Sequence, residues 1–252
     1  MHAPILVTGG TGTLGRKVVP LLRAAGRDVR VLTRTAREPA DGVEYVVSDL
    51  LAGTGIEQAV EGIEVVVHLA GGPKGDDKAT AALVAGAKPA GVRHIVLISV
   101  IGADTVPLGY LRAKQGAEKV LATSGIGYSI VRAAQFHDLT LTMVRGMAKL
   151  PVVPVPGLRL QPVDSGEVAA RIAELALDRP AGRVADLAGP KVYPMRELVD
   201  GYLAASGKHR LRMPVRLPGR AGRAYRAGAN LSVAGAARGR RTWEEFLAEA
   251  IA

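Results

Sequence analysis

The stretch TGGTGTLG, residues 8–15, constrains the fold more than any other part of the sequence. It lies between a short apolar run and a helical pattern, and its glycines recur every three residues. A strand that turns tightly into a helix, with its backbone close to a phosphate, favours residues without a Cβ atom. The free N–H groups at the start of the helix then attract a pyrophosphate. The loop therefore predicts a dinucleotide site built from Gly9, Thr11, Gly12, Thr13, Leu14 and Gly15.

Apolar strand patterns alternate with helical patterns through the first half of the chain. Strands are expected over 3–8, 28–34, 43–49, 64–71, 92–100 and 126–133, and helices over 16–26, 54–62, 76–91 and from about 110. Thr54 and Glu57 have the spacing of a capping box at the start of the second helix. Apolar strands separated by helices imply a parallel sheet covered on both faces. With right-handed crossovers, the expected fold is α/β, a doubly wound Rossmann sheet.

The alternation weakens after residue 134, where a smaller C-terminal α/β lobe is expected. Its patterns comprise an extended Pro-rich run at 151–157, helices at 164–178, 194–207 and 242–252, and a short strand at 183–189. We therefore expect a cofactor-binding core over 1–134 and a substrate-binding lobe over 135–252, integrated into one globular unit.

The composition excludes several classes of site. The 252 residues include no cysteine, which removes disulfides, thiolate metal sites and cysteine nucleophiles. The spacing of His, Asp and Glu suggests no metal site. No run of about 18 apolar residues occurs, so no membrane span is expected, and the N-terminal residues do not have the pattern of a secretory signal. A cytoplasmic monomer or homodimer is the expectation.

The net charge of +10 arises from one late segment, residues 207–241, which holds ten Lys or Arg and no acid. Arg220, Arg223 and Arg226 recur every three residues and would form a stripe on a helix. Such a stripe can bind nucleic acid or an anionic substrate, or be a solvated face. Tyr225 is the segment's one stacking aromatic, so nucleic acid is the unlikely partner. A strip of apolar residues is expected to pack on the protein or line a pocket, namely Leu211, Met213, Val215, Leu217 and Pro218.

The residues after the second strand predict which dinucleotide binds. An NAD site usually places an acid about 20 residues after the glycines, whereas this chain has Arg34 and Arg37 there. A guanidinium pairs with a 2′-phosphate, which predicts NADP(H) over NAD(H), with Arg34 as the contact. Strand ends supply the other expected cofactor contacts, which are Asp49, Leu50, Ala70 and Gly71.

Tyr110 and Lys114 are four residues apart on an expected helix, which places them on one face. A tyrosine can protonate the oxyanion of a reduced carbonyl when its pKa, about 10 unperturbed, is lowered. A lysine one turn away lowers it and can also hold the nicotinamide ribose. Ser99, at the end of the fifth strand, is a candidate donor to the substrate oxygen. The alternatives are a helix-surface pair without chemistry and a serine that only satisfies the backbone.

These motifs resemble a known group. TGGTGTLG, LTR, SDL, HLAG, YLRAK and VRAAQFHD are similar to those of the atypical short-chain dehydrogenase/reductases, most of all the NmrA-like NAD(P)H-binding branch, over about 1–190. The tail resembles proteins described as nucleoside-diphosphate-sugar epimerase-like. The resemblance implies a Rossmann fold with a small substrate lobe. Active relatives often carry an Asn in the helix after the fourth strand, where this chain has Ala82, which leaves the proton relay incomplete.

Three functions are open at this stage. The first is an NADPH-dependent oxidoreductase that reduces a small carbonyl, enone or quinone-like acceptor. The second is a non-catalytic NADP(H)-binding sensor, and the third is a sugar-nucleotide epimerase or dehydratase. Gln135, Phe136 and His137 follow the sixth strand and are the expected substrate contacts. A second acid and a buried wall residue are the alternative roles of His137.

Overall fold

The computed structural model describes residues 3–39, 41–232 and 235–251, which divide into two compact units. The first unit holds the described residues up to 99, together with 109–131 and 168–184. The second holds 100–108, 132–167 and the described residues from 185 onward. The sequence predicts one boundary, at residue 134. The chain instead passes between the two units several times, in part because a later helix returns to cover the sheet of the first unit.

A parallel sheet in the order β3-β2-β1-β4-β5-β6 forms the centre of the first unit, and β9 pairs with β6. Thr8 lies opposite both Leu32 and His68, so the carboxyl ends of three strands meet at one edge. The strands of this unit are β1 (Ile5–Thr8), β2 (Val29–Thr33), β3 (Val43–Val47), β4 (Val65–His68), β5 (His94–Val100), β6 (Gly127–Ala133) and β9 (Gly182–Arg183).

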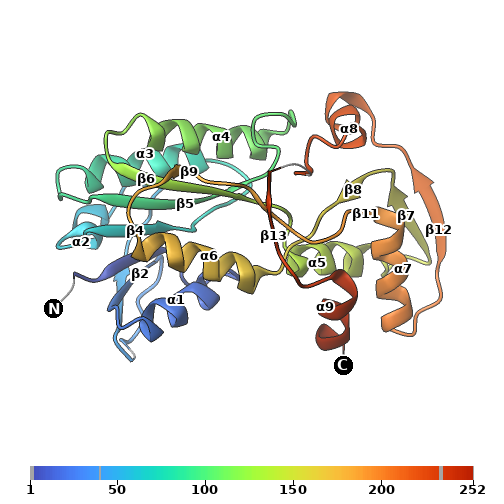
Figure 1. Cartoon of the computed structure of the whole chain (residues 1–252), viewed down its shortest axis with the longest axis horizontal. Coiled ribbons are helices and arrows are strands. Elements are labelled where there is room, and N and C mark those ends of the chain that lie inside the picture. The colour runs from blue at the N-terminus through green and yellow to red at the C-terminus, as the bar shows by residue number, and fades with distance from the viewer. Residues whose placement is uncertain (1–2, 40, 233–234, 252) are drawn as a thin grey trace. The chain divides into compact units, whose positions relative to one another are not determined.

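Helices cover both faces of this sheet, as Figure 1 shows, with α3 and α4 on one face and α1 and α6 on the other. They are α1 (Gly15–Ala24), α2 (Ile56–Val60), α3 (Asp76–Ala87), α4 (Gly109–Ala122) and α6 (Ser165–Leu177). Because the sheet is covered on both sides, its inner strands are mainly apolar; Ile5, Leu6 and Val7 of β1 are completely buried. The predicted doubly wound α/β fold is confirmed.

The predicted capping box at Thr54 is wrong. The residue before α2 is Gly55, which has a φ of 70° and gives no side-chain cap. Thr54 instead pairs its backbone with Asp49, and a Cβ on Gly55 would lie 2.5 Å from the carbonyl oxygen of Val47. The close approach of this turn to β3 therefore decides how the helix begins. By contrast, Thr242 does form a capping box with Glu245.

The second unit packs helices α5, α7 and α9 around a core that includes Leu141, Leu198 and Trp243. In this unit β12 runs parallel to β7, β8 pairs antiparallel with β11, and β10 pairs with β13 and with Ala133. Its elements are α5 (His137–Met147), β7 (Val152–Pro156), β8 (Arg159–Leu160), β10 (Leu187–Ala188), β11 (Tyr193–Pro194), α7 (Met195–Ala205), β12 (Leu211–Val215), α8 (Gly219–Arg226), β13 (Ala237–Arg238) and α9 (Trp243–Ala250).

Within the described ranges, none of these helices combines the length and apolar character that crossing a bilayer requires.

Candidate functional site

The glycine loop turns between β1 and α1 in a space that admits no side chain at two positions. Gly9 has a φ of 68°, and a Cβ there would lie 2.7 Å from the backbone nitrogen of Ala70. A Cβ on Gly15 would lie 2.3 Å from the carbonyl oxygen of Gly9. The Gly12 N–H donates to that same oxygen at 3.0 Å, which closes the turn. The glycine spacing is thus required by the way β1, β4 and α1 meet.

A cleft of about 500 Å³ opens at the carboxyl ends of β1 to β4 in the first unit. Eight of the predicted cofactor contacts line it, and these are Gly9, Thr11, Gly12, Arg34, Asp49, Leu50, Ala70 and Gly71. Leu14 and Gly15 are buried beneath the loop, and Thr13 is exposed. Backbone groups and small residues form most of the wall, so the cleft suits a long ligand that lies across the strand ends.

Arg34 directly follows β2, Asp49 lies two residues after β3, and both line the cleft. The Arg34 side chain is exposed, and within the described residues it forms no ion pair, so its guanidinium is available to an anion. The Asp49 carboxylate accepts hydrogen bonds from the backbone of Leu51 at 2.8 Å and Ala52 at 3.2 Å. Asp49 therefore shapes the loop that forms this part of the wall.

Asp76 is a site residue that the sequence reasoning missed. It is the first residue of α3, lines the cleft, and forms an ion pair with Lys114 at 2.9 Å. Both side chains are almost completely buried, with 5% and 7% of their surface exposed. The other carboxylate oxygen accepts the Gly72 N–H at 2.9 Å. Lys114 does not itself line the cleft, but a Cβ on Gly71 would lie 2.9 Å from its nitrogen, so the ammonium lies directly behind Gly71 at the cleft wall.

Tyr110 lies one turn before Lys114 on α4, and the Lys114 nitrogen is 5.9 Å from the centre of the Tyr110 ring. Tyr110 is 39% exposed. The two side chains therefore share one face of the helix, as their spacing predicts. The lysine is held by Asp76, and the tyrosine remains accessible to a small molecule.

The surroundings of Ser99 differ from those expected of a donor to the substrate oxygen. The side chain is 1% exposed, and its hydroxyl donates to the carboxylate of Glu118, which is itself buried on α4. The hydroxyl thus joins β5 to α4. The Ser99 hydroxyl is therefore engaged by a side chain of the fold.

His68 sits at the end of β4 in a buried chain of hydrogen bonds. Its ring nitrogens lie 2.6 Å from the Thr8 hydroxyl and 3.1 Å from the Thr80 hydroxyl. Burial lowers the pKa of His68 to about 3, helped by the charge of Lys114, so the ring is neutral. Thr80 donates to the Asp76 carbonyl at 2.7 Å, and the Thr8 oxygen accepts the Ala70 N–H at 3.1 Å.

These donors and acceptors leave one consistent arrangement for the His68 ring. The Thr80 hydroxyl donates its hydrogen bond to the Asp76 carbonyl, so towards His68 it can only accept. The Nε2–H of His68 therefore donates to the Thr80 oxygen. Nδ1 then accepts from Thr8. His68 therefore has a structural role, because these hydrogen bonds tie the end of β4 to the first turns of α3, where Asp76 meets Lys114.

The expected substrate contacts Gln135, Phe136 and His137 belong to the second unit. His137 is completely buried, and its Nε2–H donates a hydrogen bond to the Pro162 carbonyl at 3.0 Å. Its ring centre lies 5.0 Å from that of Phe246, and burial lowers its pKa. Gln135 and Phe136 are partly buried. His137 therefore takes the alternative role of a wall residue.

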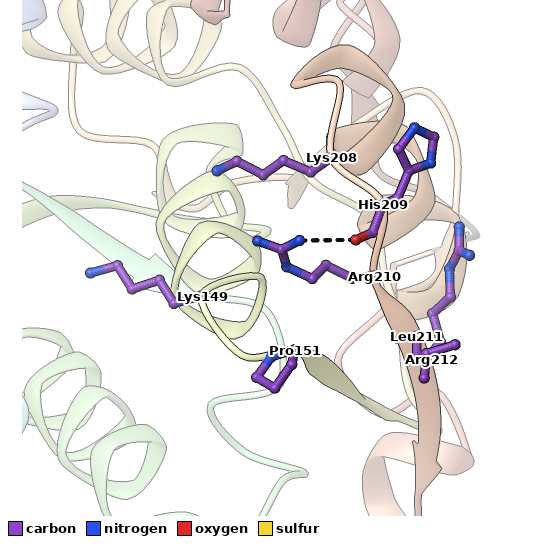
Figure 2. Close-up of a pocket in the computed structure, with 7 residues that line it drawn as sticks. All are labelled: Lys149, Pro151, Lys208, His209, Arg210, Leu211 and Arg212. Atoms are coloured by element: carbon purple, nitrogen blue, oxygen red, sulfur yellow. Dashed lines mark hydrogen bonds between the residues drawn. The ribbon is translucent and has the colours of Figure 1, made fainter.

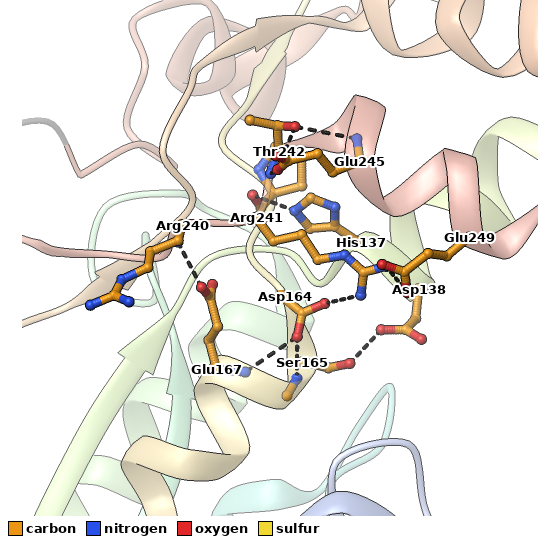
Figure 3. A network of polar contacts seen from close by, with 12 residues as sticks. His137, Asp138, Asp164, Ser165, Glu167, Arg240, Arg241, Thr242, Glu245 and Glu249 are labelled. Carbon is orange, nitrogen blue, oxygen red and sulfur yellow. Dashed lines mark hydrogen bonds and ion pairs between the residues drawn. The ribbon is translucent and has the colours of Figure 1, made fainter.

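Figure 3 shows the polar network around His137. Arg241 forms ion pairs with Asp164 at 2.9 Å and with Glu249 at 2.6 Å. Ser165 donates to Asp138 at 2.5 Å. Arg241, which belongs to the basic segment, is thus neutralised by Asp164, just before α6, and by Glu249, near the end of α9. Its charge is therefore not available to a ligand.

Known proteins share this sequence pattern and fold. The model of a family described as NAD(P)H-binding matches residues 9–179. The chain is 30% identical to a (4-alkanoyl-5-oxo-2,5-dihydrofuran-3-yl)methyl phosphate reductase of Streptomyces griseus, over 77% of this chain and 70% of that protein. It is 28% identical to an NAD(P)H azoreductase of Xenophilus azovorans, over 81% of this chain and 74% of that one.

Among solved structures, an NADPH-dependent quinone oxidoreductase of Escherichia coli, complexed with NADPH, has a similar fold. The TM-score is 0.82 at 21% identity, and the match covers 98% of this chain and 100% of that one. The family match spans the glycine loop, the lining of the cleft, and the Tyr110–Lys114 helix. The chain therefore belongs to the NAD(P)H-binding family and has its Rossmann-type fold.

Proposed function

We propose that the chain is an NADPH-dependent reductase of a small carbonyl, enone or quinone-like acceptor. The observation that carries the proposal is the buried Lys114–Asp76 ion pair at the cleft wall, with the accessible Tyr110 beside it. The reductase names of the two relatives support the same reaction class. A protein that only bound the cofactor would need the lysine, but not an accessible tyrosine beside it.

The residues of the cleft fit a dinucleotide. Gly9 and Gly12 leave the backbone free to approach a pyrophosphate, and a side chain at Gly9 would strike the backbone that follows β4. Arg34 would pair with a 2′-phosphate. A lysine ammonium carries three N–H donors, so Lys114 would retain donors for a ribose hydroxyl while it faces Asp76.

NADPH supplies a hydride when it is bound. Reduction of a carbonyl leaves an oxyanion that needs a proton, and Tyr110 is the proton donor that we propose. The positive charge of Lys114 favours the tyrosinate left behind. Asp76 holds the ammonium in position and at the same time offsets part of its charge.

The experiment is to measure NADPH oxidation by the purified chain against a panel of quinones, enones and simple carbonyls. We expect saturable turnover with at least one acceptor class and one product formed per NADPH consumed. If NADPH binds tightly but no acceptor is reduced, the reductase proposal fails.

A second candidate is a non-catalytic NAD(P)H sensor, and two observations favour it. Ser99 gives its hydroxyl to Glu118, and Ala82, which stands where active relatives often carry an Asn, packs against the apolar core. With the Ser99 hydroxyl engaged and the Asn replaced by Ala82, fewer groups are left to pass a proton towards the acceptor. The panel separates the two candidates, because a sensor binds NADPH without turnover.

Replacing Arg34 with alanine should weaken NADPH binding by about 10- to 100-fold, which corresponds to the loss of charged hydrogen bonds to one phosphate. NADH lacks the 2′-phosphate, so its affinity should stay nearly constant. Fluorescence titration with both cofactors measures the change in preference. Arg37→Ala is the matched control, since Arg37 is exposed and does not line the cleft. An unchanged preference in Arg34→Ala would remove Arg34 as the phosphate contact.

A further inference from the structure

A second, strongly basic pocket lies within the second unit. It has a volume of about 630 Å³ and is lined by Lys149, Pro151, Lys208, His209, Arg210, Leu211 and Arg212. Two stretches far apart in the chain meet there, because β12 pairs in parallel with β7 and Leu211 lies opposite Val152. None of the lining residues is acidic.

The cations in this pocket have two orientations, as Figure 2 shows. Lys149, Lys208 and Arg210 extend to the same side, with Arg210 between the two lysines, whereas Arg212 points away. Arg212 also forms an ion pair with Asp200 at 2.6 Å. We call Lys149, Lys208 and Arg210 the cation trio.

The charges of the cation trio are not neutralised by the protein. In the part of the chain that the structure describes, none of the three forms an ion pair with a carboxylate. The Nη1 of Arg210 donates to the His209 carbonyl at 2.9 Å, which fixes the guanidinium, while its Nε–H has no hydrogen-bond partner among the described residues. Three like charges that converge repel one another, and an anion placed between them offsets this cost.

The pKa of Tyr202 reflects the positive charge around this pocket. Lys208 donates to its hydroxyl at 3.2 Å. Burial pushes the pKa of Tyr202 upward, but the hydrogen bonds and charges of Lys208 and Arg145 outweigh burial, so its pKa lies below the ordinary value. A fourth cation, Arg145, thus adds to the positive potential at this pocket.

We propose that the pocket binds a compact anion with two phosphate groups, held by the cation trio. A single phosphate monoester carries a charge of about −1.5 to −2 near neutral pH, less than three lysine and arginine charges supply. A diphosphate balances the trio more fully and offers an oxygen to each member. The planar fork of Arg210 suits two oxygens at once, and the lysines act as point charges on either side.

The test is calorimetric titration of the protein, saturated with NADPH, with inorganic pyrophosphate. Saturation keeps pyrophosphate out of the cofactor cleft. We expect one site per chain, binding inorganic phosphate more weakly, and we expect Lys149→Gln with Lys208→Gln to weaken pyrophosphate binding about tenfold or more. ADP as a second ligand distinguishes a free diphosphate from one carried by a nucleotide.

Arg212→Gln is the matched control, because it removes one positive charge from the same lining without touching the trio. It should change the affinity much less than Lys149→Gln alone. Equal weakening by the two single substitutions would show a diffuse electrostatic field and overturn the proposal. So would the loss of pyrophosphate binding on NADPH saturation, which would place the anion in the cofactor cleft. Unchanged NADPH binding in each variant shows that the variants are folded, and it keeps this test separate from the turnover assay.

Discussion

Replacing Lys114 with methionine should destabilise the protein by roughly 3–5 kcal/mol, which is the usual cost of removing one partner of a buried ion pair. The substitution leaves the Asp76 carboxylate buried, with 5% of its surface exposed and no cation to face it. The Gly72 N–H stays bonded to the other carboxylate oxygen and offsets only part of that charge. Urea unfolding near neutral pH measures the loss.

A double substitution separates the charge from the packing. Lys114→Met with Asp76→Asn removes both charges, so it should recover a large part of the lost stability. Lys191→Met is the control for an exposed lysine, because Lys191 lies 3.5 Å from Glu197 and is 52% exposed. An exposed pair of this kind contributes about 0–1 kcal/mol. If Lys114→Met cost no more than Lys191→Met, the buried pair would not stabilise this fold.

The sequence predicts the first unit well because its signals are local. The glycine loop, the apolar strands and the helices between them are each readable from a short window, and the parallel sheet follows from their alternation. The pairing of Asp76 with Lys114 is different. From the sequence, Asp76 is one of two acids that begin a helix, a common position for an acid. Only the packing of α3 on α4 shows that its carboxylate faces a buried lysine.

Helix α5 shows where local patterns are insufficient. Its residues HDLTLTMVRGM include two threonines and a glycine, which have low helix propensity, and no helix is expected there from the sequence. In the structure Leu141 and Val144 are buried in the core of the second unit with Leu198 and Trp243. Tertiary burial thus outweighs local preference. The same burial encloses His137, which from sequence alone is as plausible a substrate contact as a wall residue.

The basic segment required the structure for a different reason. Its ten positive charges are visible in the sequence, but their availability is not. Arg241 is paired with Asp164 and Glu249, and Arg212 with Asp200. Lys208 and Arg210 meet Lys149, which lies outside the segment, only because β12 pairs with β7. The charge of the segment therefore predicts that the protein can bind an anion, but it does not predict where the anion binds.

Tyr110→Phe should lower kcat for NADPH-dependent reduction by about 10²- to 10⁴-fold, the usual contribution of a positioned general acid. The substitution removes one hydroxyl and leaves the ring beside Lys114, so NADPH affinity should stay nearly unchanged. Steady-state kinetics with the best acceptor of the panel measure kcat, and fluorescence titration measures cofactor binding. Tyr45→Phe, on β3, is the matched control for the loss of a tyrosine hydroxyl elsewhere in the first unit.

The distribution of the effect between kcat and KM decides the role of Tyr110. A group that donates a proton only in the transition state lowers kcat and kcat/KM together, whereas a group that merely holds the acceptor raises KM with kcat unchanged. Because Ser99 is committed to Glu118, the proposed site has no second hydroxyl from β5 to replace Tyr110. An unchanged kcat in Tyr110→Phe would therefore mean that the acceptor takes its proton from water, and that the Lys114–Asp76 pair serves cofactor binding and stability alone.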